Sequence, residues 1–309
     1  MATSGKLVDA SGDADIGNGI LLMLAAVAVL SLMDAAMKQL VQHYPPMEVS
    51  CLRGLASIPI FLFGVTVTRQ WRRVVPVRWL AHFLRGGLSI LMLWMFIYAL
   101  SKLSLSTAYG IVLCAPLLIT ALSALVLREH VGQHRWFAVV GGLIGVGIIL
   151  KPSGTEAATL AGFAALAAAL CYAIVALMLR RLTSTDSTLS IALSFVVMIG
   201  LGCGILAYPD WVTPARAHWP LIAFLGLCGS AGQYLIIGAF RCAPPSLIAP
   251  FEYTALLWAV ALDWFVWSTA PSARVLIGGS VVIATGLYLI HRERRARHTI
   301  PNPMPDSGI

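Results

Sequence analysis

The sequence predicts an all-α integral membrane protein with ten transmembrane helices, arranged as two inverted five-helix repeats. The composition, the spacing of ten apolar runs and the repetition of those runs support this prediction. Of the 309 residues, 59% are hydrophobic and 11% are charged, and the mean hydropathy is +0.86. Soluble domains carry about 45–50% apolar and about 25% charged residues. The composition therefore excludes an ordinary soluble enzyme, a disordered chain and a nucleic-acid-binding module.

Ten apolar runs, separated by short polar gaps, account for most of the chain. The first five cover residues 17–41, 46–67, 79–100, 104–127 and 136–150. The second five cover residues 160–179, 188–207, 219–240, 246–267 and 275–290. A helix of about 20 apolar residues crosses a bilayer, whereas an open strand edge is not tolerated in lipid. Each run is therefore expected to be a spanning helix, which leaves no room for a sizeable soluble domain.

Polar segments flank the runs at both ends of the chain. Residues 1–16 are expected to form a disordered cytoplasmic tail and not a signal peptide, because they lack a basic start and a small-residue cleavage site. Residues 292–309 are expected to form a basic cytoplasmic tail. The first repeat is then expected to span residues 17–152, and the second residues 158–291.

The distribution of Lys and Arg predicts the orientation in the membrane. With ten spans and both termini inside, fourteen of these residues lie on the inner side and four on the outer side, namely Lys102, Lys151, Arg216 and Arg274. Short loops rich in Lys and Arg remain in the cytoplasm. The net charge of +8 therefore indicates the orientation of membrane helices, not binding to nucleic acid.

The two sets of runs repeat each other. A shift of about 140 residues superposes them in order and pairs identical residues, such as Gly86 with Gly226 and Ala99 with Ala239. Because each set has an odd number of helices, the second repeat must lie upside down relative to the first. Inverted repeats are typical of many secondary transporters, which bind substrate near the midplane between the two halves.

Several short motifs resemble the EamA type of the drug/metabolite transporter superfamily, over about residues 20–294. In the first half they are Met33-Asp34 with Lys38, Arg53-Gly54, Leu84-Arg85-Gly86, Ser106-Thr107-Ala108 up to Pro116, Arg128-Glu129 and Arg135-Trp136. In the second half they are Ala243-Pro244, residues 249–254, and Gly286-Leu287-Tyr288. The second-half motifs resemble a bacterial subgroup that includes amino-acid, S-adenosylmethionine and riboflavin transporters. Thr269 departs from the pattern, since many members carry an acid at this counterpart of Glu129.

Ionisable residues inside the runs are candidates for function, because inserting one into the membrane costs about 2.5–3.5 kcal/mol. Asp34 and Lys38 lie four residues apart on one helix face, so they are expected to pair, either in gating or as a structural ion pair. Arg53, in the second run, is expected to bind substrate or to tie helices together.

Glu252 is the most isolated acid in the apolar runs, shortly after Pro250 in the ninth run. Burial without a paired cation favours the protonated carboxyl. Glu252 is therefore expected to bind substrate and exchange protons, or else to bond the backbone that Pro250 leaves free. Asp263 is expected at the membrane interface. Pro116 and Pro250 interrupt counterpart runs in the two halves, a pattern that points to a transport site, so both are assigned to gating.

A set of uncharged side chains inside the runs is expected to line the same cavity, or to pack between helices. It comprises Trp94, Tyr98, Tyr109, Gln233, Tyr253 and Trp258. Aromatic faces offer a flat or cationic substrate a surface on which to stack.

These observations predict a secondary transporter that works by alternating access in a bacterial inner membrane. The first choice of substrate is an exported amino acid or similar zwitterion, because Arg53 and Glu252 would present opposite charges to one cavity. The resemblance implies a second choice, uptake of S-adenosylmethionine or riboflavin. A membrane-embedded enzyme or a non-transporting scaffold is the alternative of another class. The expected partners are the lipid bilayer, a small molecule and protons; no metal, cofactor or nucleic acid is expected.

Overall fold

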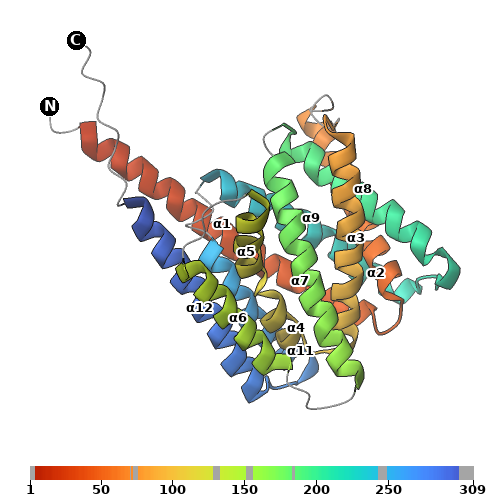
Figure 1. Ribbon diagram of the computed structural model, residues 1–309. Coiled ribbons are helices and arrows are strands. Elements are labelled where there is room, and N and C mark those ends of the chain that lie inside the picture. Colours follow the sequence, from red (N-terminus) through yellow and green to blue (C-terminus); the bar gives the residue numbers. More distant parts are fainter. Residues whose placement is uncertain are drawn as a thin grey trace, which may run out of the picture.

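The computed structural model describes residues 4–69, 71, 76–127, 133–150, 156–182, 185–242 and 249–298, and this part of the chain contains helices, turns and no strand (Figure 1). The helices of the first half are α1 (Ser4–Leu40), α2 (Pro46–Thr68), α3 (Trp79–Lys102), α4 (Leu105–Val112), α5 (Ala115–Leu127) and α6 (Gln133–Leu150). Those of the second half are α7 (Glu156–Leu182), α8 (Thr188–Ala207), α9 (Trp219–Cys242), the 3-10 helix η4 (Ala249–Thr254), α11 (Ala255–Trp267) and α12 (Ala273–His298). Two further 3-10 turns, η2 (Tyr208–Asp210) and η3 (Arg216–His218), lie between α8 and α9.

Six helical segments of the described chain are long and apolar enough to cross a membrane. They are Gly17–Leu40, Pro46–Thr68, Trp79–Lys102, Thr159–Leu179, Leu189–Asp210 and Arg216–Ile236. Three shorter apolar helices cover Leu105–Ile119, Trp136–Leu150 and Ala273–Tyr288. The protein is therefore an all-helical integral membrane protein.

Both predicted tails are shorter than expected where the structure describes them. Helix α1 begins at Ser4, so residues 4–16 are helical in place of the expected disordered tail. Helix α12 continues to His298 and includes the first residues of the expected basic tail. No proline interrupts either extension, so each spanning helix can continue beyond its apolar run.

The helix boundaries repeat with the 140-residue shift that the sequence predicts. Helices α3 and α9 begin at Trp79 and Trp219 and have the same length of 24 residues. Helices α5 and α11 begin at Ala115 and Ala255 and both have 13 residues. The two halves therefore use the same succession of helices.

The two repeats are interleaved and do not form separate bodies. The main interfaces pair α2 with α8, α6 with α12, α1 with α9, and α3 with α7. Exchanging every helix for its counterpart in the other half leaves this set of pairs unchanged, as a pseudo-twofold axis requires. In Figure 1, α6 and α12 run together on one side of the bundle, and α3 and α7 run side by side nearer its middle. A site between the repeats is therefore built from both halves of the chain.

Glycines allow the closest approach in the two interfaces that pair counterpart helices. A Cβ on Gly54 of α2 would overlap the backbone of Gly200 on α8. A Cβ on Gly145 of α6 would lie 2.7 Å from the carbonyl oxygen of Gly278 on α12. Small residues at such contacts let membrane helices pack backbone against backbone.

Both counterpart runs that contain a proline are broken, as the sequence predicts. A turn at Leu113–Cys114 separates α4 from α5, and Pro116 is the second residue of α5. In the second half, η4 contains Pro250 and precedes α11. Proline lacks a backbone N–H, so it fits the first turn of a new helix. The predicted fourth and ninth runs are therefore each divided into two helical pieces.

Candidate functional site

Asp34 and Lys38 share a face of α1, but they do not form the expected pair. The hydroxyl of Tyr109 on α4 donates a 2.5 Å hydrogen bond to Asp34 Oδ2. Lys38 Nζ donates a 2.9 Å bond to Asp263 Oδ1 on α11 and forms an ion pair with it. Both α1 residues are 8% exposed. Each charge therefore finds a partner on another helix, which ties α1 to α4 and α11.

Arg53 of α2 completes a cluster with Asp34 and Tyr109. Its guanidinium interacts electrostatically with both groups. Phe96 of α3 packs edge-on against Tyr109, with ring centroids 6.3 Å apart and an interplanar angle of 75°. A charge in the low dielectric of the membrane needs a counter-charge and hydrogen bonds. Arg53 supplies the counter-charge to Asp34 and Tyr109 supplies the hydrogen bond, so the cluster is close to neutral overall.

A small pocket lies beside Arg53 and brings in one predicted polar residue. Its volume is about 10 Å³, room for about one water molecule. Gln233 of α9 lines it together with Arg53, and the other lining residues are Gly54, Ser57, Phe195, Val196, Ile199 and Gly229. Arg53 and Gln233 therefore face one space between α2, α8 and α9.

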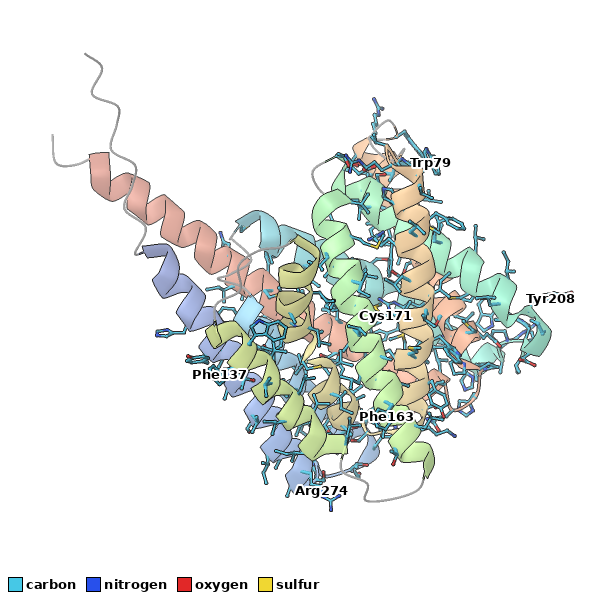
Figure 2. The ribbon with its side chains drawn as sticks, viewed as in Figure 1. Trp79, Phe137, Phe163, Cys171, Tyr208 and Arg274 are labelled. Atoms are coloured by element: carbon cyan, nitrogen blue, oxygen red, sulfur yellow. The ribbon has the colours of Figure 1, made fainter. Side chains whose placement is uncertain are left out.

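Glu252 lies in η4 and not in a continuous ninth helix. Its carboxyl interacts electrostatically with Tyr172 of α7 and with Tyr253. Tyr172 directly follows Cys171, which is labelled midway along α7 in Figure 2. The Tyr172 residue has 40% of its surface exposed. Glu252 and Arg53, both in the described part of the chain, form no ion pair with each other. The two groups expected to face one substrate thus have separate sets of partners.

The predicted aromatic residues divide between the cluster and other surroundings. Tyr109 joins the Asp34–Arg53 cluster, whereas Tyr253 is buried, and a Cβ on Gly286 of α12 would overlap its ring. Trp94 and Tyr98 each lie two positions from Phe96 on α3, about 200° around the helix, so they point away from the cluster. Trp258 lies on the exposed side of α11.

Asp263 is the polar residue whose environment the sequence interpretation predicted wrongly. It is 0% exposed, not interfacial as expected, and accepts backbone bonds from Leu105 N at 2.9 Å and Ser106 N at 2.7 Å. These are the first residues of α4, whose N-cap is Ser104. The one available signal was its own charge, because a carboxylate inside an apolar run requires a cation. Nothing in the sequence identified Lys38, 225 residues away, as that cation.

Polar side chains also tie loops to helices where α2 begins. The Tyr44 hydroxyl shares a 2.7 Å hydrogen bond with His218 Nδ1 and accepts one from Ala215 N at 2.9 Å. Glu48 Oε2 accepts a 2.9 Å bond from Val212 N. These contacts hold the α8–α9 connection, which begins at Tyr208 in Figure 2, against the start of α2.

A second group of polar contacts lies beyond the other end of α2. Asp186, between α7 and α8, accepts a 2.7 Å bond from Val77 N and a 2.8 Å bond from Thr185 Oγ1, and lies 3.2 Å from His82 Nε2. Burial opposes the ionisation of Asp186, but these bonds and the imidazole outweigh it and lower its pKa. Arg85 of α3 is buried nearby and donates a 2.8 Å bond to the carbonyl oxygen of Ile191 on α8.

Nothing in the described part of the chain resembles a metal site, since no three His, Cys, Asp or Glu residues there are grouped to hold an ion. The arrangement offers instead an anion on α1, a cation on α2 and an aromatic hydroxyl on α4, the first piece of a broken run. Such groups can bind and release a small charged molecule without reacting with it.

Comparison with known proteins identifies the fold and its relatives. The profile of the EamA-like transporter family matches residues 17–151 and again residues 159–292. The chain is 29% identical to a riboflavin transporter of Vibrio cholerae over 229 residues, which cover 74% of this chain and 76% of the relative. It is 24% identical to the pseudopaline exporter CntI of Pseudomonas aeruginosa, over 88% of this chain and 95% of that protein.

Two further similarities cover most of the chain. An S-adenosylmethionine uptake transporter of Rickettsia prowazekii is 24% identical over 90% of this chain and 94% of its own length. A protein of known crystal structure, at 18% identity, superposes with a TM-score of 0.63 over 92% of this chain and 99% of that one. The structural match shows a shared fold.

Proposed function

Because the chain belongs to the EamA-like transporter family, we propose that it moves a small zwitterionic metabolite, with amino acids as the first candidates, out across a bacterial inner membrane. Transport is secondary and proceeds by alternating access. The observation that supports the substrate class is the Asp34–Arg53–Tyr109 cluster, which places a cation and an anion together in the membrane.

A zwitterion can take the place of the cluster's internal partners. Its carboxylate would bind the Arg53 guanidinium, which matches a carboxylate with two parallel hydrogen bonds. Its ammonium group would bind Asp34 in place of the Tyr109 hydroxyl. Asp34 and Arg53 each keep an oppositely charged partner during this exchange, so neither is left without a counter-charge in low dielectric. Because the pocket beside Arg53 has room for about one water molecule, binding requires the helices to separate.

The proposed topology has ten spans, two inverted repeats and both termini in the cytoplasm. The excess of Lys and Arg in the loops assigned to the inner side supports it. The pairing of counterpart helices and the breaks at α4–α5 and at η4–α11 support alternating access. Discontinuous helices in corresponding positions form the site in many transporters with inverted repeats.

Glu252 supports a second candidate substrate within the same class of protein. An acid beside the Tyr172 and Tyr253 rings suits a cationic group, because a carboxylate and aromatic faces both attract positive charge. Uptake of S-adenosylmethionine, which carries a sulfonium cation, is therefore the alternative, and uptake of riboflavin is a further one. A membrane-embedded enzyme or a non-transporting scaffold is the alternative of another class.

Counterflow in proteoliposomes tests the proposal. Vesicles loaded with unlabelled compounds are offered trace amounts of the labelled amino acids, S-adenosylmethionine and riboflavin, one at a time. We expect wild-type protein to accumulate at least one labelled amino acid. The double variant Asp34→Asn/Arg53→Gln removes both charges together, so neither remains unpaired, and is expected to fold and to lose transport.

Lys102→Met is the matched control, because it removes an exposed cation at the end of α3 and is expected to transport normally. Wild-type protein that is folded but carries none of the three compound classes would contradict the proposed function. Transport by the double variant at the wild-type rate would show that the cluster does not bind substrate.

A further inference from the structure

The ion pair between Lys38 and Asp263 is buried and joins the two halves of the chain. Lys38 belongs to α1 and Asp263 to α11, and Lys38 Nζ also lies 4.2 Å from the ring centroid of Trp267. Breaking such a pair by removing one partner is strongly destabilising, because the other charge stays in low dielectric. In this setting, Lys38 and Asp263 either stay paired or leave the low-dielectric interior together.

Asp263 binds α4 as well as Lys38. Its two oxygens accept bonds from Leu105 N and Ser106 N, in the first turn of α4, while Oδ1 also accepts the bond from Lys38. A carboxylate is favoured at this position, since the N-terminus of a helix carries partial positive charge. One side chain of α11 therefore holds α1 and α4 at the same time, and α4 packs against α11 in Figure 1.

Helix α4 is a short unit with its own attachments. It has eight residues and is joined to α5 by the turn at Leu113–Cys114. Beyond the contact through Asp263, Tyr109 ties it to Asp34, one helical turn before Lys38 on α1. Both attachments of α4 thus reach one face of α1, and the inner one belongs to the proposed substrate site.

We propose that Lys38, Asp263 and the first turn of α4 form a latch that closes one entrance to the transport pathway. The inference rests on the proposed function, since a closed entrance has meaning in a transporter. The latch lies at the end of α4 that precedes Tyr109, the side that the proposed topology places outside the cell. When a substrate displaces Tyr109 from Asp34, α4 loses its inner polar attachment, and the latch is the polar contact that still joins it to α1.

Cys114 provides a native reporter of the opening. It lies at the turn between α4 and α5 and is 1% exposed. A variant that keeps Cys114 and carries Ala at Cys51, Cys171, Cys203, Cys228 and Cys242 gives one reactive thiol. A membrane-impermeant maleimide added to right-side-out vesicles measures how fast Cys114 is labelled from the latch side. The same reagent added to inside-out vesicles measures its labelling from the other side.

We expect Lys38→Met and Asp263→Asn to speed the labelling of Cys114 from the latch side at least about tenfold, because each shifts the equilibrium toward the open entrance. Labelling from the other side should not increase. Asp186→Asn is the control, since it removes a buried acid beyond the far end of α2 and should not change labelling from the latch side. Circular dichroism of each variant verifies that it has folded.

A charge exchange separates the latch from a simple ion pair. In Lys38→Asp/Asp263→Lys the two charges are swapped, but Lys has no acceptor for the N–H groups of Leu105 and Ser106. We therefore expect fast labelling to persist in the exchanged variant. Labelling that returns to the wild-type rate would overturn the capping part of the latch.

Unchanged labelling in folded Lys38→Met and Asp263→Asn would overturn the latch, and so would an equal increase from both sides, which indicates general loosening. The counterflow assay of wild-type protein is read independently. Transport without a change in labelling contradicts the latch alone, whereas absence of transport contradicts the proposed function whatever the labelling shows.

Discussion

The Tyr109 hydroxyl and the Asp34 carboxylate are 2.5 Å apart and join α4 to α1 in the interior of the protein. This bond connects a helix of the broken fourth run to the face of α1 that also carries Lys38. Recognition of a charged substrate and movement of α4 therefore depend on the same carboxylate.

Tyr109→Phe should lower the initial rate of counterflow at least about tenfold, because substrate binding at Asp34 can no longer release α4 when the bond that it would displace, worth about 1.5–3 kcal/mol for a charged acceptor, is already missing. Tyr98→Phe makes the same chemical change on the side of α3 away from Phe96 and should leave the rate unchanged. Rates are compared at equal amounts of reconstituted protein. Equal loss of transport in both variants would contradict a specific role for Tyr109.

Gly54→Ala should lower the melting temperature of the detergent-solubilised protein, since the new methyl group overlaps the backbone of Gly200. Overpacking of this kind costs about 1–3 kcal/mol, and a backbone contact cannot yield as a side chain can. Gly64→Ala on the same helix is the control, because a Cβ there meets nothing within 4 Å. A melting temperature that is unchanged in Gly54→Ala would show that α2 and α8 are not in tight contact.

Asp186→Asn should lower the melting temperature at pH 7, and the difference from wild type should shrink in strong acid. Asp186 lies outside the spanning helices, and its pKa is lowered from the ordinary 3.8. A group with a lowered pKa contributes stability that is complete above its ordinary pKa and is lost as the pH falls through the lower folded value. The wild-type and variant curves should therefore converge below pH 3.8. The exposed Asp210→Asn serves as the control, and a difference that stays constant with pH would contradict this role of Asp186.

Glu252→Gln should abolish accumulation driven by a proton gradient and leave part of the substrate exchange. Glutamine keeps the size of the side chain and some hydrogen bonding, but it cannot take up or release a proton. The assay compares uptake into proteoliposomes with and without an imposed pH gradient, at equal protein. If the carboxyl only bonds the backbone near Pro250, glutamine is tolerated and gradient-driven accumulation is retained.

Sequence periodicity predicted the broad architecture because membrane insertion is governed by local composition. The family profile confirms the EamA resemblance in both halves. The breaks near Pro116 and Pro250 were predictable for a similar reason, since a proline inside a helix removes a backbone hydrogen bond and favours a kink or a break, although α2 continues through Pro59. Tyr109 and Arg53 could be chosen as candidates from the sequence, because placing polar groups in lipid costs free energy.

The pairing of the charged groups was not predictable from spacing. Asp34 and Lys38 are four residues apart, a spacing at which opposite charges pair in isolated helices. In the folded protein, Tyr109 and Asp263 are better partners, because the half-buried Tyr109 hydroxyl needs an acceptor and the fully buried Asp263 carboxylate needs a cation. Spacing does place Trp94 and Tyr98 opposite Phe96 on α3, but only the packing of Phe96 against Tyr109 shows which of these two faces meets the cluster.

A helical membrane protein of two similar halves, with a few charges buried among apolar helices, follows from the order of the residues alone. Those properties depend on composition and on periodicity along the chain. The partners of these charges depend on the packing of the helices. Lys38 binds Asp263, Asp263 caps α4, and Arg53 joins Asp34 and Tyr109, while Glu252 has other partners. The physical reason is that a buried charge is stabilised by whichever opposite group lies nearest in space, and helix packing sets that distance.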